Sequence, residues 1–377
     1  GAVLAMVALF MPFVLLKPNR VAEGTPYRLA ELQQPLLVGM LAGFAAVALV
    51  LSVLGESRRV RVGKLAAGLG LFTAAILLLG TVGETLITED MPYARLSPQI
   101  SFWFVMLATF VIIDGSLRNA PFSSITKAAF GLSPFVLMAV LIGVGFLDDL
   151  AILQEFHNRE DRFAKELGSH LLLSGVSVSA AVAIGVPLGL LAWRRKRFEK
   201  QVFVIVNGLQ TIPSLALFGL MIAPLALISQ AFPVLRQLGI RGIGNAPALI
   251  ALTLYALLPI TRNAYTSMAV IPRAVVDAGR GMGMGKHDLL RFVEFPLAIP
   301  IILSGIRTSA VQAIGNTAVA ALIGAGGLGA FVFQGLGQAA PDLIVMGVIP
   351  IVALAIVVDR LLGVLIRVAT PRGIRNV

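Results

Sequence analysis

The chain has 377 residues, of which 58% are hydrophobic and only 13% charged, and its formal net charge is +11. A soluble domain averages about 25% charged residues, and a soluble fold could not bury this much apolar surface. The composition therefore indicates an integral membrane protein and excludes a cytosolic enzyme and a disordered protein. The absence of cysteine excludes a disulfide-linked scaffold.

The excess of basic residues fits the cytoplasmic loops of a membrane protein, which are enriched in Lys and Arg. We therefore expect no nucleic-acid partner. The three histidines, His157, His170 and His287, lie far apart in the sequence, so we expect no metal site built on them.

A helix needs about 20 apolar residues to cross the hydrocarbon core, and ten apolar stretches are candidates. Three of them, 99–113, 134–147 and 247–260, are short, so we expect them to extend into their flanks or to be partly re-entrant. All ten stretches are continuous rather than alternating, which is typical of spanning helices and not of barrel strands. The chain is apolar from its first residue, so we interpret its start as the remaining part of a first spanning helix. The predicted spans are 1–16, 36–54, 65–87, 99–113, 134–147, 171–193, 201–229, 247–260, 297–323 and 343–367.

The distribution of basic residues predicts the orientation. The loops 55–64, 114–133, 194–200 and 261–296 and the C-terminal tail contain more Lys and Arg than the alternate set. The richer set belongs in the cytoplasm, so both termini are expected to be cytoplasmic.

A polar stretch divides the chain into two domains. We place an N-terminal transmembrane extension of five helices at 1–150, a polar linker on the outer side at 151–170, and a core of five helices at 171–377. Most motifs fall in the second half.

Two glycine patterns resemble nucleotide-binding motifs but lack the required context. The run from Gly324 to Gly329 fits G-x-G-x-x-G but follows an apolar span instead of a strand of a soluble βαβ unit. The run from Gly281 to Lys286 has Arg280 in place of the first glycine of a P-loop and His287 in place of Ser or Thr. We therefore expect no ATP hydrolysis through a P-loop in this chain.

Polar residues inside the spans are candidates for a transport path. Pro213 removes a backbone donor within an apolar span, which predicts either a path-lining break or a simple kink. The candidate path residues are Asn207, Gln210, Thr211, Pro213, Ser214, Asn316 and Thr317. Charged residues in or near spans, for which structural pairing and transport remain open, are Glu84, Asp114, Arg307, Asp359 and Arg360.

The cytoplasmic loop 261–296 has a pattern of its own. Residues 273–280 are compatible with a short helix, a glycine-rich turn follows at 281–285, and residues 287–296 lead into the next span. A short helix with a glycine hinge at the membrane surface suggests a docking element for a soluble partner, although an ordinary loop remains possible.

This loop resembles the EAA motif of binding-protein-dependent ABC importer permeases, E-A-A-x3-G-x9-I-x-L-P. Both gaps have the right length, but Asp, Gly, Val and Phe replace the Glu, second Ala, Ile and Leu of the motif. The glycine is expected to weaken the helix by up to about 1 kcal/mol relative to alanine. The residues of the expected ATPase-coupling loop are Asp277, Ala278, Gly279, Arg280, Gly283, Val293, Phe295 and Pro296.

The wider second half resembles the permeases of osmoprotectant importers for glycine betaine, choline or carnitine. The resemblance covers 171–367 and is carried by the stretches 210–216, 254–263 and 310–329. The additional spans before it resemble the longer YehY-like permeases.

This resemblance implies an all-α integral membrane protein with about ten transmembrane helices, in which a type I ABC importer core of five helices follows a five-helix extension. It implies a multi-pass permease in a bacterial inner membrane that imports glycine betaine or a related quaternary amine. The expected partners are cytoplasmic ATPase subunits, a periplasmic solute-binding protein, a second permease subunit (identical or paralogous) and membrane lipid. The chain itself is expected to bind no cofactor, with ATP-Mg held by the ATPase.

Two other classes of protein remain as alternatives. A secondary carrier driven by an ion or proton gradient would need ionisable residues within the membrane that load and release the ion. A membrane-embedded enzyme would need a cluster of catalytic side chains at one depth, and the sequence shows no such cluster.

Overall fold

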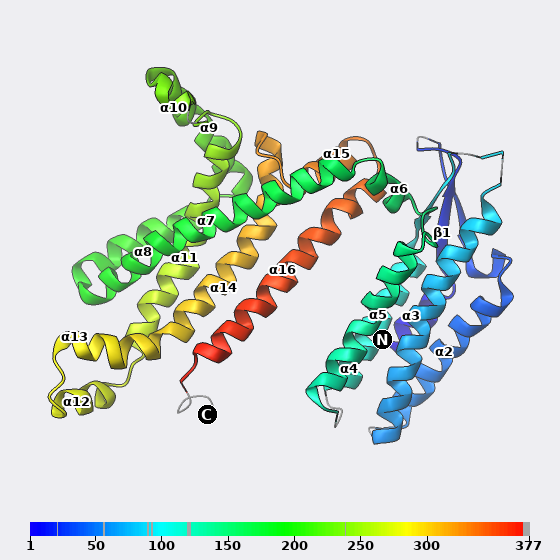
Figure 1. Cartoon of the computed structure of the whole chain (residues 1–377), viewed down its shortest axis with the longest axis horizontal. Helices are drawn as coiled ribbons and strands as arrows, with labels where there is room; N and C mark the ends of the chain where they lie inside the picture. The colour runs from blue at the N-terminus through cyan, green and yellow to red at the C-terminus, as the bar shows by residue number, and fades with distance from the viewer. Residues whose placement is uncertain are drawn as a thin grey trace. The chain divides into compact units, whose positions relative to one another are not determined.

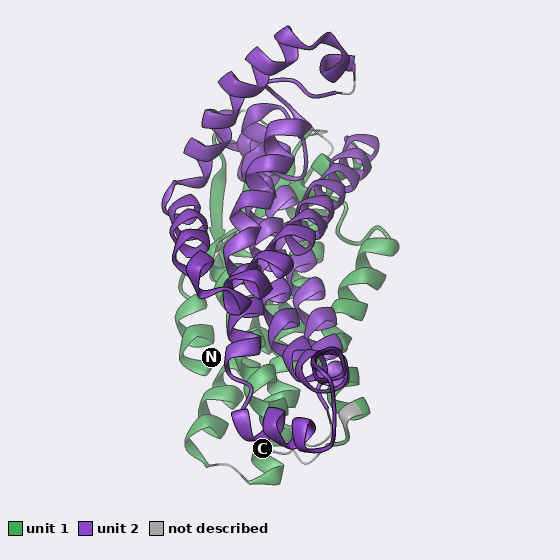
Figure 2. Cartoon of the chain, turned by 90° about the vertical axis from the view of Figure 1, so that its left-hand side faces the viewer, with its two compact units in different colours: residues 1–158 green, residues 159–377 purple. Residues whose placement is uncertain are grey.

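The computed structural model describes residues 1–20, 22–55, 57–88, 90–91, 93–118, 122–237 and 239–371. Within these ranges the chain is mostly helical and forms two compact units, 1–158 and 159–377, which are shown in different colours in Figure 2. Nine helices of the described residues are long and apolar enough to cross a membrane.

Unit 1 contains four of these helices, which Figure 1 shows side by side. Their polar starts differ from their apolar bodies. For example, the Ser57 hydroxyl accepts a hydrogen bond from the backbone N–H of Val60 and caps the second of them. The four helices are α2 (Pro35–Val53), α3 (Arg58–Leu86), α4 (Ile100–Arg118) and α5 (Ser124–Gly143).

The prediction of a spanning helix at 1–16 is wrong. The structure has a short helix α1 (Ala2–Ala8), followed by strand β1 (Pro12–Lys17). The strand takes up residues that the prediction assigned to the helix. Unit 1 therefore has four described spans where five were expected.

The expected all-helical fold also includes a small sheet. Strand β1 lies between β2 (Thr25–Arg28) and β3 (Arg95–Pro98), antiparallel to both. The third strand lies far along the chain, so its pairing with β1 could not be read from the local hydropathy of 1–16. This sheet satisfies backbone groups that a helix would have satisfied internally.

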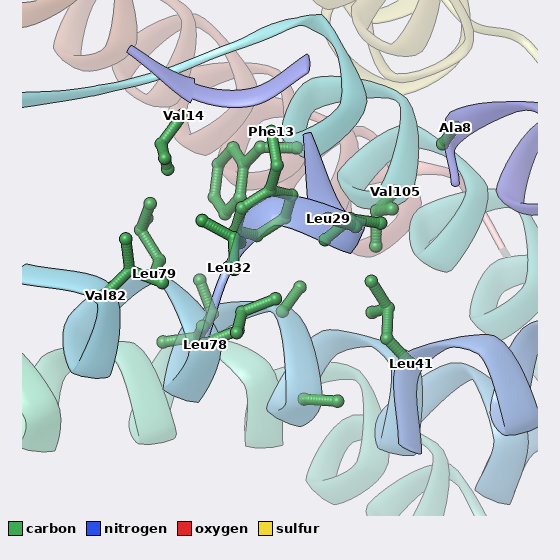
Figure 3. Packing of buried hydrophobic residues seen from close by; sticks show 14 of the residues in the cluster. Ala8, Phe13, Val14, Leu29, Leu32, Leu41, Leu78, Leu79, Val82 and Val105 are labelled. Atoms are coloured by element: carbon green, nitrogen blue, oxygen red, sulfur yellow. The ribbon is translucent and has the colours of Figure 1, made fainter. Parts of the chain in front are cut away.

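The core of unit 1 joins the sheet to the helices. Phe13 of β1 is fully buried and packs edge-on against Phe102 of α4, with ring centroids 6.0 Å apart. Figure 3 shows Phe13 close to Leu32 and Leu78. Burial of a large apolar side chain stabilises a fold by about 1.5–3 kcal/mol, so β1 is held by its side chains as well as by its hydrogen bonds.

Unit 1 ends with helix α6 (Ala151–His157), which is attached to β3 by an ion-pair cluster. The Glu155 carboxylate accepts a hydrogen bond from Arg95 Nη1 at 2.8 Å and lies 3.2 Å from Arg20 Nε. Its side chain is only 5% exposed. Two arginines compensate a buried carboxylate, which would otherwise be costly.

Unit 2 contains the other five candidate spans and several short elements. The predicted single span at 201–229 consists of two helices, which are separated at Ile212 and Pro213. The elements are α7 (Glu160–Arg194), α8 (Lys196–Thr211), α9 (Ser214–Ala231), α10 (Pro233–Gln237), α11 (Asn245–Ala269), α12 (Arg273–Gly281), α13 (Lys286–Asp288), the π-helix η2 (Leu289–Glu294), α14 (Phe295–Ala320), η3 (Ala321–Ile323), α15 (Gly329–Gly337) and α16 (Pro341–Ala369).

Helix α11 lies at the centre of unit 2, with α7 and α14 packed on it. Small residues permit this close packing. A Cβ atom at Gly305 of α14 would lie 2.7 Å from the carbonyl oxygen of Pro259, and one at Gly189 of α7 would collide with the carbonyl oxygen of Thr261. In lipid, small residues at helix interfaces let the backbones approach and gain van der Waals contact.

The region expected to be a polar linker, 151–170, is helical in the structure. Residues 160–170 form the first turns of α7 and hold the glycine-rich turn that precedes α15. The Glu166 carboxylate accepts a hydrogen bond from the backbone N–H of Gly327 at 2.7 Å, and the Ser169 hydroxyl donates to the carbonyl of Ala325. The turn has positive φ at Gly324, Gly326 and Gly327.

Candidate functional site

The predicted coupling loop forms a short exposed helix, α12, at the end of unit 2 opposite α15 (Figure 1). The helix ends in a Schellman motif at Gly283, whose φ is +83°. The N–H of Gly283 donates to the carbonyl of Arg280, and the N–H of Met284 donates to the carbonyl of Gly279. The glycine of the motif is therefore required by a left-handed backbone that other residues rarely adopt.

Gly279, which replaces the second alanine of the EAA motif, is buried in the structure. A Cβ atom there would lie 2.5 Å from Cδ2 of Leu289, and Leu289 is itself only 5% exposed. The departure from the motif thus has a packing reason. The Leu289 side chain occupies the space that the alanine methyl group would need, so an alanine at 279 would require Leu289 to move.

The charged residues of α12 face solvent. Asp277 and Arg280 form an ion pair of 3.4 Å, with side chains that are 67% and 66% exposed. An exposed pair of this kind contributes at most about 1 kcal/mol to stability. Both side chains, like that of Ala278, belong to a helix that projects from the unit and is available to a partner.

The last part of the motif leads into α14 through the π-helix η2. Val293 lies within η2, Phe295 is the first residue of α14, and Pro296 follows in its first turn. Pro296 has no backbone N–H to donate to the preceding turn. The π-helix η2 ends just before it, and regular α-helical hydrogen bonding starts again in α14. Phe295 is 44% exposed.

The second candidate region is the break between α8 and α9. Ile212 lies outside both helices, and its carbonyl accepts a hydrogen bond from the hydroxyl of Tyr255 in α11. Gln210 Nε2 donates in turn to the backbone carbonyl of Tyr255 at 2.9 Å. Two hydrogen bonds therefore join the region of the break to the central helix α11, one donated by α11 and one accepted by it.

A second proline explains why Tyr255 has a free carbonyl. Its helical partner would be the N–H of Pro259, four residues later, which proline lacks. Ser309 of α14 donates to the neighbouring carbonyl of Ala256 at 2.9 Å. The carbonyls of Tyr255, which Pro259 releases, of Ala256 and of Ile212 are thus each bonded by a side chain, from α8, α14 and α11 respectively.

The predicted path residues differ in exposure. Asn207, Thr211 and Pro213 are exposed, while Gln210, Ser214 and Asn316 are partly buried. Thr317 is fully buried, and its hydroxyl donates to the carbonyl of Ala313 in its own helix. Asn316 lies on α14, which contacts α9. Asn207 lines an open hollow of about 330 Å³ together with Lys196, Glu199, Lys200, Phe203 and Val204.

Sequence reasoning missed a polar stripe on α14. Ser304, Thr308 and Gln312 are exposed and four residues apart, so they lie on one face of the helix. This spacing was available in the sequence as a signal. Together with Asn316, the stripe gives a spanning helix a polar exposed face.

The charged residues within the last spans form a pair. Arg307 Nε and Nη2 each donate to one oxygen of Asp359, both at 2.6 Å, which joins α14 to α16. Asp114 is paired with Arg118 of the same helix at 2.7 Å. These contacts favour the structural interpretation of the charged residues. Among the described residues, no group of three or more His, Asp or Glu could hold a metal ion.

The chain is similar to known transport proteins in both units. The family model described as "Binding-protein-dependent transport system inner membrane component" matches residues 181–370. The model described as "ABC transporter permease YehY, N-terminal domain" matches residues 1–153.

Individual relatives match about half of the chain. The osmoprotectant import permease protein OsmW of Salmonella typhimurium is 45% identical over 206 residues, which is 55% of this chain and 91% of the relative. The glycine betaine/carnitine/choline transport system permease protein OpuCB of Bacillus subtilis is 39% identical over 209 residues, 55% of this chain and 89% of the relative. One chain of the MetNI methionine ABC transporter, in an inward-facing conformation, is 24% identical with a TM-score of 0.49, over 56% of this chain and 97% of that chain.

These matches decide between the classes of function that the sequence left open. An importer powered by a separate ATPase is confirmed, and neither the ion-driven carrier nor the membrane-embedded enzyme remains. The family model that matches residues 181–370 spans half of the chain, so the chain belongs to the binding-protein-dependent transport system inner membrane components. It is a multi-pass permease subunit of an ABC importer and not itself an enzyme.

Proposed function

We propose that this permease imports a small compatible solute with a quaternary ammonium group, of which glycine betaine is the first candidate. The observation that carries the proposal is the 45% and 39% identity to permeases named for osmoprotectant and for glycine betaine, carnitine and choline transport. A quaternary ammonium group is recognised by the faces of several aromatic rings. We place that recognition in the binding protein and only transient contacts in the permease.

The proposed coupling step uses α12. Its exposed end would seat in a groove of a cytoplasmic ATPase, and the buried contact between Gly279 and Leu289 would pass the movement to η2 and α14. A rigid contact of this kind transmits a displacement, because packed interiors are hardly compressible. Two permease subunits, identical or paralogous, would enclose the path.

The proposed path runs along the break between α8 and α9 and the polar stripe of α14. The break is supported by side-chain hydrogen bonds from Tyr255 and Gln210, which exchange more easily than a helical backbone bond. Unwound backbone within a membrane protein is tolerated where it lines a cavity or is covered by protein. We infer that the second permease subunit covers the exposed side of this surface.

The proposed orientation places α12 and the C-terminal tail in the cytoplasm and the three strands on the outer side, where a periplasmic binding protein docks. It follows from the basic loops. With residues 1–16 not forming a complete span, the cytoplasmic placement of the first residue no longer follows from that argument.

The solute is tested by reconstituting the permease with its ATPase and binding protein in proteoliposomes. ATP-driven uptake of labelled glycine betaine should exceed uptake without ATP, and choline and carnitine should compete, whereas methionine should not. Uptake of methionine in preference to all three would reject the quaternary-amine proposal while leaving the ABC importer intact.

The coupling assignment is tested with Gly283→Asp. Asp tolerates the left-handed backbone better than most residues, and no atom lies within 4 Å of the new Cβ, so the protein should fold. We expect ATP-driven uptake to be lost while the permease still reaches the membrane. Gly281→Asp is the matched control, because that position is also open but has no positive φ. Equal uptake by both variants would contradict the role of Gly283.

A further inference from the structure

An open hollow of about 760 Å³ lies beside the coupling helix in unit 2, and the proposed transport function does not use it. Its walls come from the end of α7, from α12, from α13 and from η2. The lining residues are Trp193, Arg194, Arg280, Lys286, His287, Leu289, Leu290 and Glu294.

The hollow has a basic rim. Arg194, Arg280 and Lys286 carry positive charges, and Glu294 is the only acid among the lining residues. Within the described part of the chain, no carboxylate is recorded as an ion-pair partner of Arg194 or Lys286, whereas Arg280 has only a long, exposed contact to Asp277. Three cations gathered around one hollow favour an anionic ligand.

The floor of the hollow is apolar and lies at the end of a spanning helix. Trp193 and Leu290 are partly buried and both pack against the same apolar cluster, which contains Met268 and Ile302, and Arg194 is the last residue of α7. Trp is enriched at the membrane interface because its ring has an apolar body and a polar N–H. The hollow therefore combines an interfacial aromatic floor with a basic rim.

We propose that this hollow binds the headgroup of an anionic phospholipid of the cytoplasmic leaflet, with its phosphate between Arg194, Arg280 and Lys286. An amphiphilic anion matches both the rim and the floor, whereas an acidic segment of a soluble protein would match the rim alone. The lipid then joins the end of α7 to the coupling helix, so the charge of the membrane affects how α12 is held.

The two tryptophans of the chain make the site directly observable. The Trp103→Phe variant leaves Trp193 as the only tryptophan of the chain. The full permease is reconstituted without other proteins in vesicles that contain equal amounts of phosphatidylglycerol and phosphatidylcholine, with brominated acyl chains on one lipid at a time, so that all tryptophan fluorescence comes from position 193. Brominated phosphatidylglycerol should quench Trp193 more strongly than brominated phosphatidylcholine.

Variants of the rim test the proposed contacts. Each basic residue near an anionic surface strengthens binding roughly fivefold, so Arg194→Gln with Lys286→Gln should lower the preference for phosphatidylglycerol by at least that factor. Arg58→Gln with Arg59→Gln removes two charges from unit 1 and should leave the preference unchanged. Inorganic phosphate in the buffer should not compete; competition would indicate a soluble anion and overturn the lipid assignment.

Native mass spectrometry of the chain with both tryptophans provides a second measurement. It should detect phosphatidylglycerol retained by the native chain and less of it on the double rim variant. Equal quenching by the two lipids would overturn the proposal. So would loss of ATPase binding in the rim variant with an unchanged lipid preference, since the rim would then be a surface for an acidic protein segment.

Discussion

Pro213 and Pro259 decide where polar groups are needed inside the core unit. Proline removes a backbone donor, and in lipid each released carbonyl needs a partner from another side chain. Gln210 provides this partner for the carbonyl of Tyr255, which Pro259 releases, and the Tyr255 hydroxyl donates to the carbonyl of Ile212 beside Pro213. The glutamine was a candidate from the sequence, but the tyrosine was not, since nothing local connects it with residue 212.

We predict that Tyr255→Phe destabilises the protein and slows transport. The variant keeps the ring but leaves the carbonyl of Ile212 without its donor, at a cost of about 1–3 kcal/mol. Thermal unfolding in detergent should show a lower Tm, and ATP-driven uptake should fall. Tyr93→Phe is the control, because Tyr93 is 77% exposed. An unchanged Tm together with normal uptake would mean that the bond is not needed.

A second prediction at this scale concerns pH. Burial raises the pKa of the Asp149 carboxyl above its ordinary value of 3.8, and the neighbouring carboxylates of Asp148 and Glu84 add to the effect. The folded state therefore disfavours the ionised form of Asp149. As the pH rises from the unfolded pKa through the raised folded pKa, this carboxyl progressively lowers the free energy of unfolding. The full penalty is present at a pH above the raised folded pKa.

Asp149→Asn removes that charge and should raise the Tm at pH 7. The gain should shrink as the pH falls through the raised folded pKa and vanish below about 3.8. Glu23→Gln, at an exposed position of the same unit, is the comparison. A gain that is independent of pH would show that packing, and not charge, is responsible. The measurement is a series of unfolding curves in detergent between about pH 3 and pH 8.

At the scale of elements, the helix α12 and the π-helix η2 are packed against each other. The contact between Gly279 and Leu289 joins them, and the Schellman motif at Gly283 sets the direction in which the chain returns. The motif residues that looked independent in the sequence are therefore connected through a residue outside the motif. The short helix and the glycine turn after it were predicted from the sequence, but this contact was not.

We predict that Gly279→Ala, which restores the residue of the EAA motif, impairs coupling. The alanine favours the helix by about 1 kcal/mol, but its methyl group displaces the buried Leu289, and overpacking typically costs about 1–3 kcal/mol. Combining it with Leu289→Val, which withdraws the crowded methyl group, should restore uptake. The measurement is ATP-driven uptake against ATP hydrolysis. If the single variant is fully active, the packing explanation is wrong.

At the scale of the whole molecule, the chain consists of a permease unit and a separate N-terminal unit. The division lies between Asn158 and Arg159, because Glu155 is fixed to β3 in unit 1 while Glu166 is bonded to the glycine-rich turn of unit 2. OsmW is matched over 91% of its length by 206 residues of this chain, so a relative of about the size of unit 2 suffices as a permease.

We predict that residues 159–377 alone insert into the membrane and bind the ATPase. The control begins at residue 171, the boundary that hydropathy predicted. It lacks Glu166 and Ser169, and with them two bonds to the glycine-rich turn. We expect the shorter fragment to have a lower Tm and poorer ATPase binding in a pull-down from detergent. An equal Tm and equal ATPase binding of the two fragments would place the boundary at residue 171, as hydropathy predicted.

The amino-acid sequence by itself determined the membrane class and nine of the ten predicted spans, and it predicted a short helix followed by a glycine turn at 273–285, because hydropathy and motif spacing are local properties. Only the tertiary structure decided that residues 1–16 contain a strand, that Thr317 is buried, that Leu289 packs against Gly279, and that Tyr255 satisfies the break at Ile212. The physical reason is common to all four. Each depends on a contact with a residue distant in the chain or on another element, and such contacts are selected by packing and by the need to pair every buried polar group.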